Sequence, residues 1–170
     1  ESGSGKTTLM KLLAGHLACT GQRLLNGLDA EADPAAWRQA VAWVDARDPA
    51  FDDLTPEALM QRLRPGFPSF DAMVWQRHID GFGLAPHAFK TLYMMSTGMR
   101  RKAVLAVVLA SGCPLLLLDE PTAGLDAPSS AWLVETLNTM GLRPNQTALV
   151  VLGEWPDALD CTTTTVLTGP

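Results

Sequence analysis

The chain begins with a glycine-rich stretch, ESGSGKTTL, which constrains the fold more than any other feature. Gly3 and Gly5 can take backbone angles closed to other residues, so successive N–H groups can converge on one anion. Lys6 adds a mobile positive charge, and Thr7 adds a hydroxyl that can bind a metal ion. The apolar spacing that follows predicts a helix over residues 6–15, whose positive end faces the same anion. A loop of this kind is typical of phosphate binding.

Bulk properties limit the class of protein. A chain of 170 residues suits one domain, and its net charge of −5 gives no electrostatic reason to expect nucleic acid as a partner. The longest apolar run, AVLAVVLA at 103–110, is far shorter than the roughly 18 residues of a membrane span.

Strand patterns and helix patterns alternate on both sides of a proline-rich middle. This alternation predicts an α/β fold with a parallel sheet covered on both faces. The predicted strands lie at 21–27, 40–44, 114–120, 147–152 and 162–167, and the predicted helices at 6–15, 33–40, after Thr55, after Ser69 or Asp71, at 101–111 and at 129–140.

The run LLLLDEP places Asp119 and Glu120 at the carboxyl end of a buried strand. Ligands bind at that edge of an open parallel sheet, and a phosphate-binding loop leaves the sheet from the same edge. Asp119 can therefore hold Mg²⁺ together with Thr7, and Glu120 can orient or deprotonate a water aimed at the terminal phosphate.

With these motifs in order, nearly the whole chain resembles the nucleotide-binding domain of an ATP-binding-cassette protein. ESGSGKTT is similar to the phosphate loop and LLLLDEP to the second nucleotide motif. MSTGMRRK (95–102) resembles the family signature LSGGQ, with Met95 for Leu, Thr97 for Gly and Met99 for Gln. AGLD (123–126) resembles the D-loop.

The resemblance implies a P-loop NTPase fold: a three-layer core with a mostly parallel sheet and an inserted helical subdomain. The core would span 1–45 and 99–170, and the helical subdomain 46–98. It also implies ATP and Mg²⁺ as cofactors, with Glu120 as the catalytic base and with Thr7 and Asp119 on the metal. The implied nucleotide-binding residues are Ser2, Gly3, Ser4, Gly5, Lys6, Thr7 and Thr8.

Family domains work as head-to-tail pairs, as a homodimer or a heterodimer. The resemblance therefore implies that the signature residues contact the ATP of the partner subunit and that Asp126 belongs to the D-loop. These signature residues are Ser96, Thr97, Gly98 and Met99.

FPSFD (67–71) and STGMRRK (96–102) resemble the ATPase subunits of bacterial exporters. That resemblance implies a membrane-spanning partner subunit, no nucleic-acid partner, and a place on the cytoplasmic face of the plasma membrane. Candidates for the surface that meets the membrane subunit are Phe51, Leu54, Met60 and Trp75, which fit a local core equally well.

The chain departs from the family pattern in several places. Position 1 is Glu where the loop's leading Gly is usual, and two or three strands expected before the loop are absent, so we expect a piece of a longer protein. The usual metal-sensing Gln falls on Ala46, and the usual His that holds the terminal phosphate falls on Gly153. A shift of the alignment by one residue would place Asp45 or Glu154 there, and neither restores a Gln or a His. Losing such a donor typically costs about 10²–10³ in rate, so we expect slow ATP hydrolysis.

Two alternatives stay open. One is a soluble cassette protein without a membrane partner, acting on ribosomes or DNA. The other is a non-catalytic or degenerate ATP-binding module, paired with a competent subunit in a heterodimer.

Overall fold

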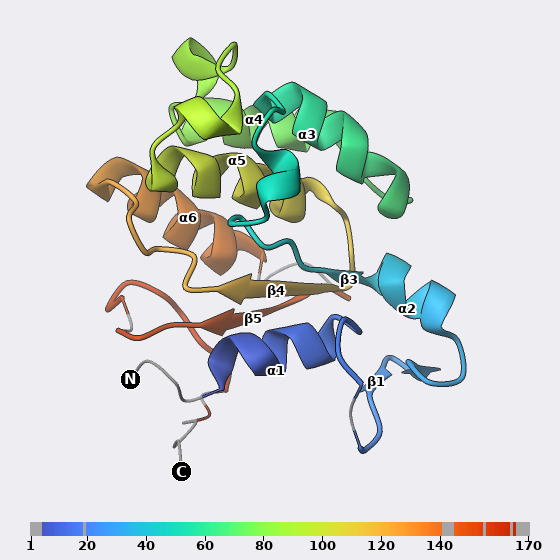
Figure 1. Cartoon of the computed structure of the whole chain (residues 1–170). Coiled ribbons are helices and arrows are strands. Elements are labelled where there is room, and N and C mark those ends of the chain that lie inside the picture. Colours follow the sequence, from blue (N-terminus) through green and yellow to red (C-terminus); the bar gives the residue numbers. More distant parts are fainter. Residues whose placement is uncertain (1–4, 19, 141–144, 155, 164, 166–170) are drawn as a thin grey trace.

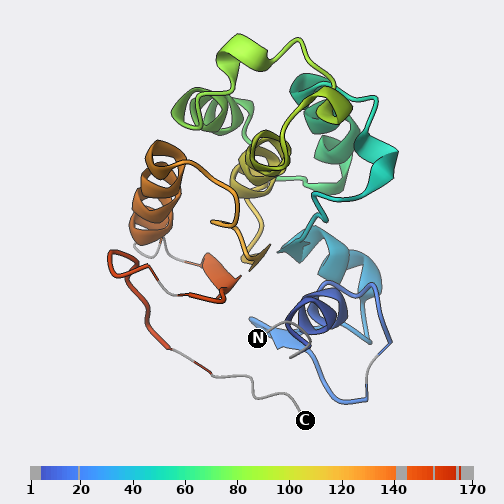
Figure 2. The same cartoon turned by 60° about the vertical axis from the view of Figure 1, so that its left-hand side comes forward.

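The computed structural model describes residues 5–18, 20–140, 145–154, 156–163 and 165, and these form an α/β structure (Figures 1 and 2). The strands are β1 (Leu24–Leu25), β2 (Leu28–Asp29), β3 (Val41–Ala42), β4 (Leu115–Asp119) and β5 (Thr147–Val151). The α-helices are α1 (Lys6–Leu13), α2 (Pro34–Ala40), α3 (Pro56–Leu63), α4 (Ala72–Gly81), α5 (Thr97–Ala110) and α6 (Ala127–Met140). Short 3₁₀ turns are η1 (Pro49–Phe51), η2 (Arg64–Gly66), η3 (Ala85–His87) and η4 (Leu92–Met94).

Strand β4 is the centre of the main sheet. Strands β3 and β5 pair with it in parallel, and Leu115 is in register with both Val41 and Thr147. Residues 116–118 are at most 2% exposed. Such burial requires an apolar strand, because helices cover both faces of the sheet. Asp119, the last residue of β4, therefore lies at the carboxyl edge of the sheet.

The two faces of the sheet belong to separate hydrophobic clusters. Because successive side chains of a strand point to opposite faces, Leu117 packs with Met10 of α1 and Trp37 of α2. Leu116 and Leu118 instead join the larger cluster formed with helices α3 to α6. Figure 1 shows this order of layers: α1 below the sheet, α5 and α6 above it, and α3 and α4 beyond α5.

Helix α5 is buried along almost its whole length, from residue 102 to residue 110. A helix that is apolar all round needs cover on every side. Here β4 and α6 cover one side, while α3 and α4 cover the other.

Side-chain caps begin the helices at the predicted places. Asp33, Thr55 and Asp71 each accept hydrogen bonds from backbone N–H groups in the first turn of α2, α3 and α4. Pro34 and Pro56 occupy the first helical positions, where a missing N–H is harmless. The predicted starts of α2 and α3 are confirmed, and Asp71 rather than Ser69 caps α4.

Three expectations need correction. The stretch 21–27, predicted as a short strand that ends in a turn, holds the shorter strand β1 and a turn at Asn26 and Gly27, which both take positive φ, but β1 pairs with β2 in a separate antiparallel hairpin and not with the main sheet. The predicted helix at 101–111 begins earlier, at Thr97, because Ser96 caps it. The predicted strand at 162–167 is wrong for its described residues 162, 163 and 165, and its other positions lie outside the described residues.

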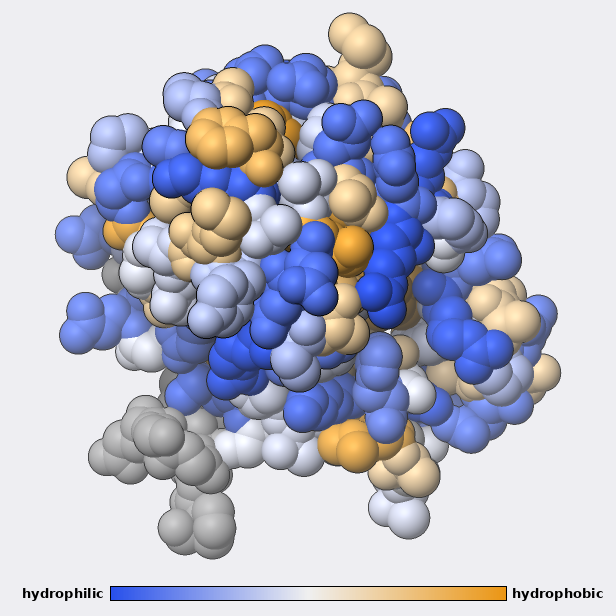
Figure 3. All heavy atoms as spheres, turned by 45° about the horizontal axis from the view of Figure 1, so that its top comes forward, coloured by the Kyte–Doolittle hydropathy of each residue, from blue (hydrophilic) through white to orange (hydrophobic). Residues whose placement is uncertain are grey.

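The helical face opposite the sheet is mostly hydrophilic, with separate apolar side chains (Figure 3). Phe51, Met60 and Trp75 are at most 9% exposed, and Leu54 packs against the same core, so these four residues are local core. The large apolar side chains that are exposed in this part of the chain are Met73, Phe89, Tyr93 and Met94.

Replacing Gly98 by Ala is expected to lower the free energy of unfolding by about 1–3 kcal/mol. A Cβ at this buried position would lie 2.2 Å from the carbonyl oxygen of Gly124, so α5 or the loop around Gly124 must move. Urea denaturation of the full-length protein measures the change. Gly66→Ala is the control, because a Cβ there meets nothing within 4 Å. Equal midpoints for the two variants would contradict the close approach.

Candidate functional site

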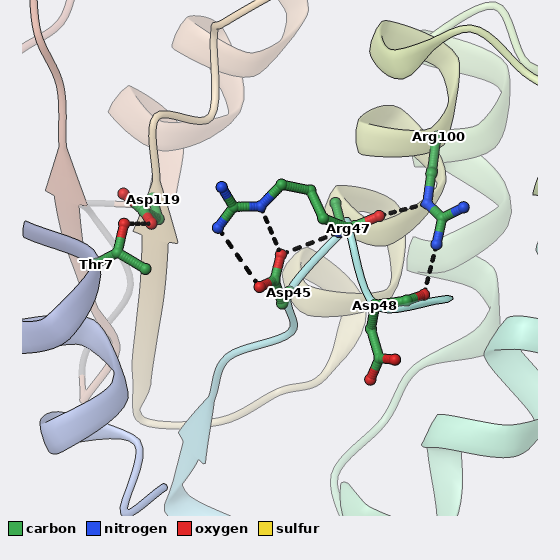
Figure 4. Close-up of polar contacts among 7 residues, drawn as sticks. Thr7, Asp45, Arg47, Asp48, Arg100 and Asp119 are labelled. Atoms are coloured by element: carbon green, nitrogen blue, oxygen red, sulfur yellow. Dashed lines mark hydrogen bonds and ion pairs between the residues drawn. The ribbon is translucent and has the colours of Figure 1, made fainter. Parts of the chain in front are cut away.

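The start of α1 and the end of β4 meet at one point. Gly5 takes a φ of 80° just before α1, and its carbonyl accepts the N–H of Leu9 at 2.8 Å. In the first turn, the hydroxyl of Thr7 donates a hydrogen bond of 2.6 Å to Oδ2 of Asp119 (Figure 4). The structure thus brings together two residues that lie 112 positions apart in the sequence.

This pair fits a hard divalent cation. Mg²⁺ takes oxygen ligands and is usually held by one or two carboxylates together with substrate phosphates. The part of the chain that the structure describes contains no cluster of three or more His, Cys, Asp or Glu that could form an all-protein metal cage. Thr7 and Asp119 offer the smaller donor set that Mg²⁺ uses beside a phosphate.

The other predicted loop residues are placed only in part. Lys6 is the first residue of α1 and is half-buried, whereas Thr8 is exposed. Ser2, Gly3 and Ser4 lie outside the described residues.

Glu120 follows Asp119 in a strained conformation. Its φ of 47° is uncommon for a non-glycine residue and is the kind of strain that functional sites often hold. Its N–H donates to the carbonyl of Val151 at 2.8 Å, and its Oε2 accepts the N–H of Gly153 at 3.1 Å. The ends of β4 and β5 therefore fix this carboxylate beside position 153.

The loop after β3 carries the second half of the site. The side chain of Arg100, from α5, donates to the carbonyls of Ala46 and Asp48 (Figure 4). It also pairs with Asp52. These contacts tie the loop to the beginning of α5. Ala46 stands where the family usually has Gln. It has only a methyl side chain, and its backbone carbonyl already accepts a hydrogen bond from Arg100.

Two arginines set the charge at this edge. The hydrogen bond with Asp45 raises the pKa of Arg47, and the charge of Asp119 acts in the same direction. Burial, followed by repulsion from Arg47, lowers the pKa of Arg101, while Asp119 and Glu120 oppose the change. Burial would raise the pKa of Asp45, but its hydrogen bonds from Arg47 outweigh burial and hold that pKa below its usual value.

The signature and D-loop residues pack on each other within this chain. Ser96 caps α5 by accepting the N–H of Met99 at 3.2 Å, while Thr97 is exposed and Gly98 is buried. Lys102 of the same helix forms an ion pair with Asp126, which also accepts the N–H of Ser129 at 2.9 Å and so caps α6. The two motifs therefore form one unit built on α5 and α6.

Sequence reasoning missed the partners of these motifs. Arg100 and Lys102 lie within the quoted MSTGMRRK and Arg47 lies next to Ala46, yet none was assigned a role. The run of basic residues at the start of α5, where cations are unfavourable, was the one available signal for Arg100, and nothing in the sequence marked Arg47.

A glycine-rich helix start whose Thr7 meets the acidic end of a central parallel strand is typical of a P-loop nucleotide-binding domain. The sequence model of the family described as "ABC transporter" matches residues 1–123. The chain therefore belongs to the ABC transporter family.

Curated relatives agree with this assignment. The chain is 32% identical to the glutathione/L-cysteine transport system ATP-binding/permease protein of Escherichia coli, over 94% of this chain and 28% of that protein. It is 36% identical to a cytochrome c biogenesis ATP-binding export protein of Pseudomonas savastanoi, over 78% of this chain and 62% of that protein. It is 34% identical to a thiamine import ATP-binding protein of Yersinia pseudotuberculosis, over 92% of this chain and 68% of that protein. The chain thus spans about a quarter to two thirds of these relatives.

Solved structures agree on the fold. The structure titled as that of an ATP binding subunit of an ABC transporter superposes with a TM-score of 0.70 at 23% identity, over 82% of this chain and 60% of that chain. The predicted α/β P-loop fold is therefore confirmed. Within the described part of the chain, every helix is too short or too polar to cross a membrane.

Replacing Asp126 by Asn is expected to lower the melting temperature of the full-length protein at pH 7 by a few degrees. Asn can still cap α6, but the Lys102 side chain, only 9% exposed, loses its counter-charge. The hydrogen bond from Lys102, and then those from Ser129, hold the pKa of Asp126 well below its usual range. A depressed folded pKa stabilises the fold above the unfolded value of about 3.9, and that stabilisation disappears as the pH falls through the folded pKa.

Thermal melts between pH 7 and pH 2 check this prediction. The difference between wild type and Asp126→Asn should shrink below about pH 4. Asp53→Asn, at an exposed carboxylate, is the control. A difference that does not vary with pH would contradict the role of the ion pair.

Proposed function

We propose that this chain is the ATP-binding and ATP-hydrolysing part of a membrane transporter. The observation that carries the proposal is the 2.6 Å contact between Thr7 and Asp119 at the carboxyl edge of the sheet. Membership of the ABC transporter family supports it. The molecule would divide into a core of residues 1–45 and 99–170 and a helical subdomain of residues 46–98.

The phosphates of ATP would lie at the start of α1. Residues 2–8 would offer backbone N–H groups to the anion together with the positive end of the helix, and the Lys6 ammonium would add a point charge against the outer phosphates. Thr7 and Asp119 would hold Mg²⁺, which offsets the negative charge of the phosphates when it is bound. Glu120 would orient a water and accept its proton.

The hydrolysis step would be slow. The carboxylate of Glu120 receives a backbone N–H from Gly153, but position 153 offers no side-chain donor for the terminal phosphate. Ala46 offers none on the opposite side. The same two absences favour a second candidate function, a degenerate ATP-binding module that pairs with a competent subunit.

The signature residues would act on the ATP of a partner subunit. Ser96 and Thr97 are exposed at the start of α5, where a hydroxyl and a helix N-terminus together suit an anion. Gly98 is buried and Met99 is partly buried, so these two residues would lie beneath this surface and support it. Both a homodimer and a heterodimer satisfy this arrangement, with the Lys102–Asp126 pair fixing the D-loop beside the signature helix.

A membrane-spanning subunit would meet the helical part, with this chain peripheral on the cytoplasmic face. The exposed apolar side chains there are Met73, Phe89, Tyr93 and Met94, at 62–80% exposure, instead of the buried residues first considered. An exporter is favoured by FPSFD and STGMRRK, although similar relatives include both an export protein and an import protein.

Lys6→Ala is expected to weaken ATP binding by about tenfold or more, because a charge-assisted contact with the outer phosphates is lost. Calorimetric titration of the full-length protein with Mg²⁺ and ATP measures the affinity. Lys11→Ala, further along the same helix, is the matched control and should bind ATP like wild type. Unchanged affinity in Lys6→Ala would remove the basis for this phosphate site.

Gly153→His is expected to raise single-turnover ATP hydrolysis by about 10²–10³. A Cβ at this position would lie 3.5 Å from Oε1 of Glu120, an ordinary contact, so the site can accept a side chain. Gly153→Ala adds the Cβ without a donor and is the control. A wild-type rate already near about 10 per second, with no gain from His, would show that the site is not slowed.

A further inference from the structure

Arg47 is the one residue of the loop after β3 whose charge is both exposed and directed along the nucleotide edge. Its side chain is 68% exposed, and it extends from the loop toward the side where Thr7 and Asp119 lie (Figure 4). Its Nε lies 3.1 Å from Oδ1 of Asp45, and its second guanidinium nitrogen lies 3.5 Å from Oδ2.

The ion pair with Asp45 orients the guanidinium of Arg47 through its Nε and one terminal nitrogen, so other N–H donors remain for a ligand. Asp45 also accepts the backbone N–H of Arg47 at 3.0 Å, so the carboxylate fixes both the turn and the side chain. An ion pair with one exposed partner contributes little net stability in water. A phosphate oxygen can therefore replace Asp45 as the acceptor, or share the five N–H donors with it.

The surrounding charges make this edge suited to an added anion. Arg101, from α5, is half-buried and repels Arg47, while Asp119 attracts both arginines and Glu120 attracts Arg101. Binding Mg²⁺ at Asp119 would cancel part of that attraction and leave the repulsion between the two arginines less compensated. A terminal phosphate placed beside the metal would relieve their repulsion.

The backbone under Arg47 is anchored for such a contact. Arg100 donates to the carbonyls of Ala46 and Asp48, which flank Arg47 on both sides. A loop fixed at the two neighbouring residues presents the side chain between them with less entropy to lose on binding.

We propose that Arg47 binds the terminal phosphate of ATP in this chain's own site, where neither Ala46 nor Gly153 offers a side-chain donor. The proposal rests on the proposed ATP site and adds a residue to it. Arginine suits this task because its planar, permanently charged fork matches phosphate oxygens. Arg47 would thereby distinguish ATP from ADP, since only ATP places a phosphate at that position.

The test measures ATP and ADP affinities by calorimetry with Mg²⁺ in the full-length protein. All variants carry Glu120→Gln, so that ATP is not consumed during the titration. Arg47→Gln should weaken ATP binding by about tenfold and change ADP binding by about twofold or less. Arg38→Gln, at an exposed arginine of α2, is the matched control and should change neither affinity.

Asp45→Asn separates a phosphate contact from a structural role of the ion pair. It frees Arg47 without removing it, so ATP affinity should stay equal or rise. If Asp45→Asn reproduces the loss seen in Arg47→Gln, the pair is structural and the proposal is overturned. Equal effects of Arg47→Gln on ATP and ADP, or no effect, overturn it as well.

The proposed ATP site can be judged separately in the same experiment. If the parent protein binds ATP and Lys6→Ala weakens that binding, but Arg47→Gln leaves the affinity unchanged, only the role of Arg47 fails. If the parent protein binds neither nucleotide, the proposed function fails together with it.

Discussion

The contact between Thr7 and Asp119 holds together the parts of the molecule on which its proposed chemistry depends. Asp119 ends a strand that is buried on both faces, and its place is fixed by pairing with β3 and β5. Thr7 belongs to the first turn of α1, whose Met10 packs under the same strand beside Leu117. The hydroxyl–carboxylate contact of 2.6 Å therefore joins a helix start and a strand end that apolar packing has already brought together. Two oxygens in such a position are preorganised for a metal ion, which lowers the cost of binding it.

Features governed by neighbouring residues could be predicted from the sequence, whereas features that need a distant partner could not. The caps at Asp33, Thr55 and Asp71 act within one helical turn, so their helix starts follow from local chemistry. Strand β4 was predicted because an apolar run that ends in two acids fits only a buried strand at an open edge. TTTT at 162–165 also has high β-propensity, but its described residues 162, 163 and 165 form no strand, because propensity alone does not supply the pairing with a neighbouring strand.

The same division holds in the candidate site. Thr7, Asp119 and Glu120 could be predicted because each belongs to a motif with its own mechanism. Gly153 lies beside Glu120, with a hydrogen bond of 3.1 Å between them, and its correspondence to the family's His stays a prediction. Arg100 and Lys102 could not be assigned, because their partners lie 54 and 24 residues away. Neither spacing follows from helix or strand periodicity.

These distant contacts form a continuous connection between the phosphate edge and the D-loop. The loop that carries Arg47 is tied by Arg100 to the first turns of α5, and Lys102 on that helix is tied to Asp126 at the start of α6. Gly98 packs directly on the loop around Gly124, so α5 and this loop have little freedom to move separately. A contiguous path alone does not establish coupling, which also requires an element with two arrangements that the ligand favours unequally. The loop after β3 would meet that requirement only if the exchange of Asp45 for a phosphate as the side-chain partner of Arg47 also shifted the turn, which Asp45 holds through the backbone N–H of Arg47. Any resulting shift of Ala46 or Asp48 would act on Arg100, and through α5 on the surface that presents Ser96 to a second subunit.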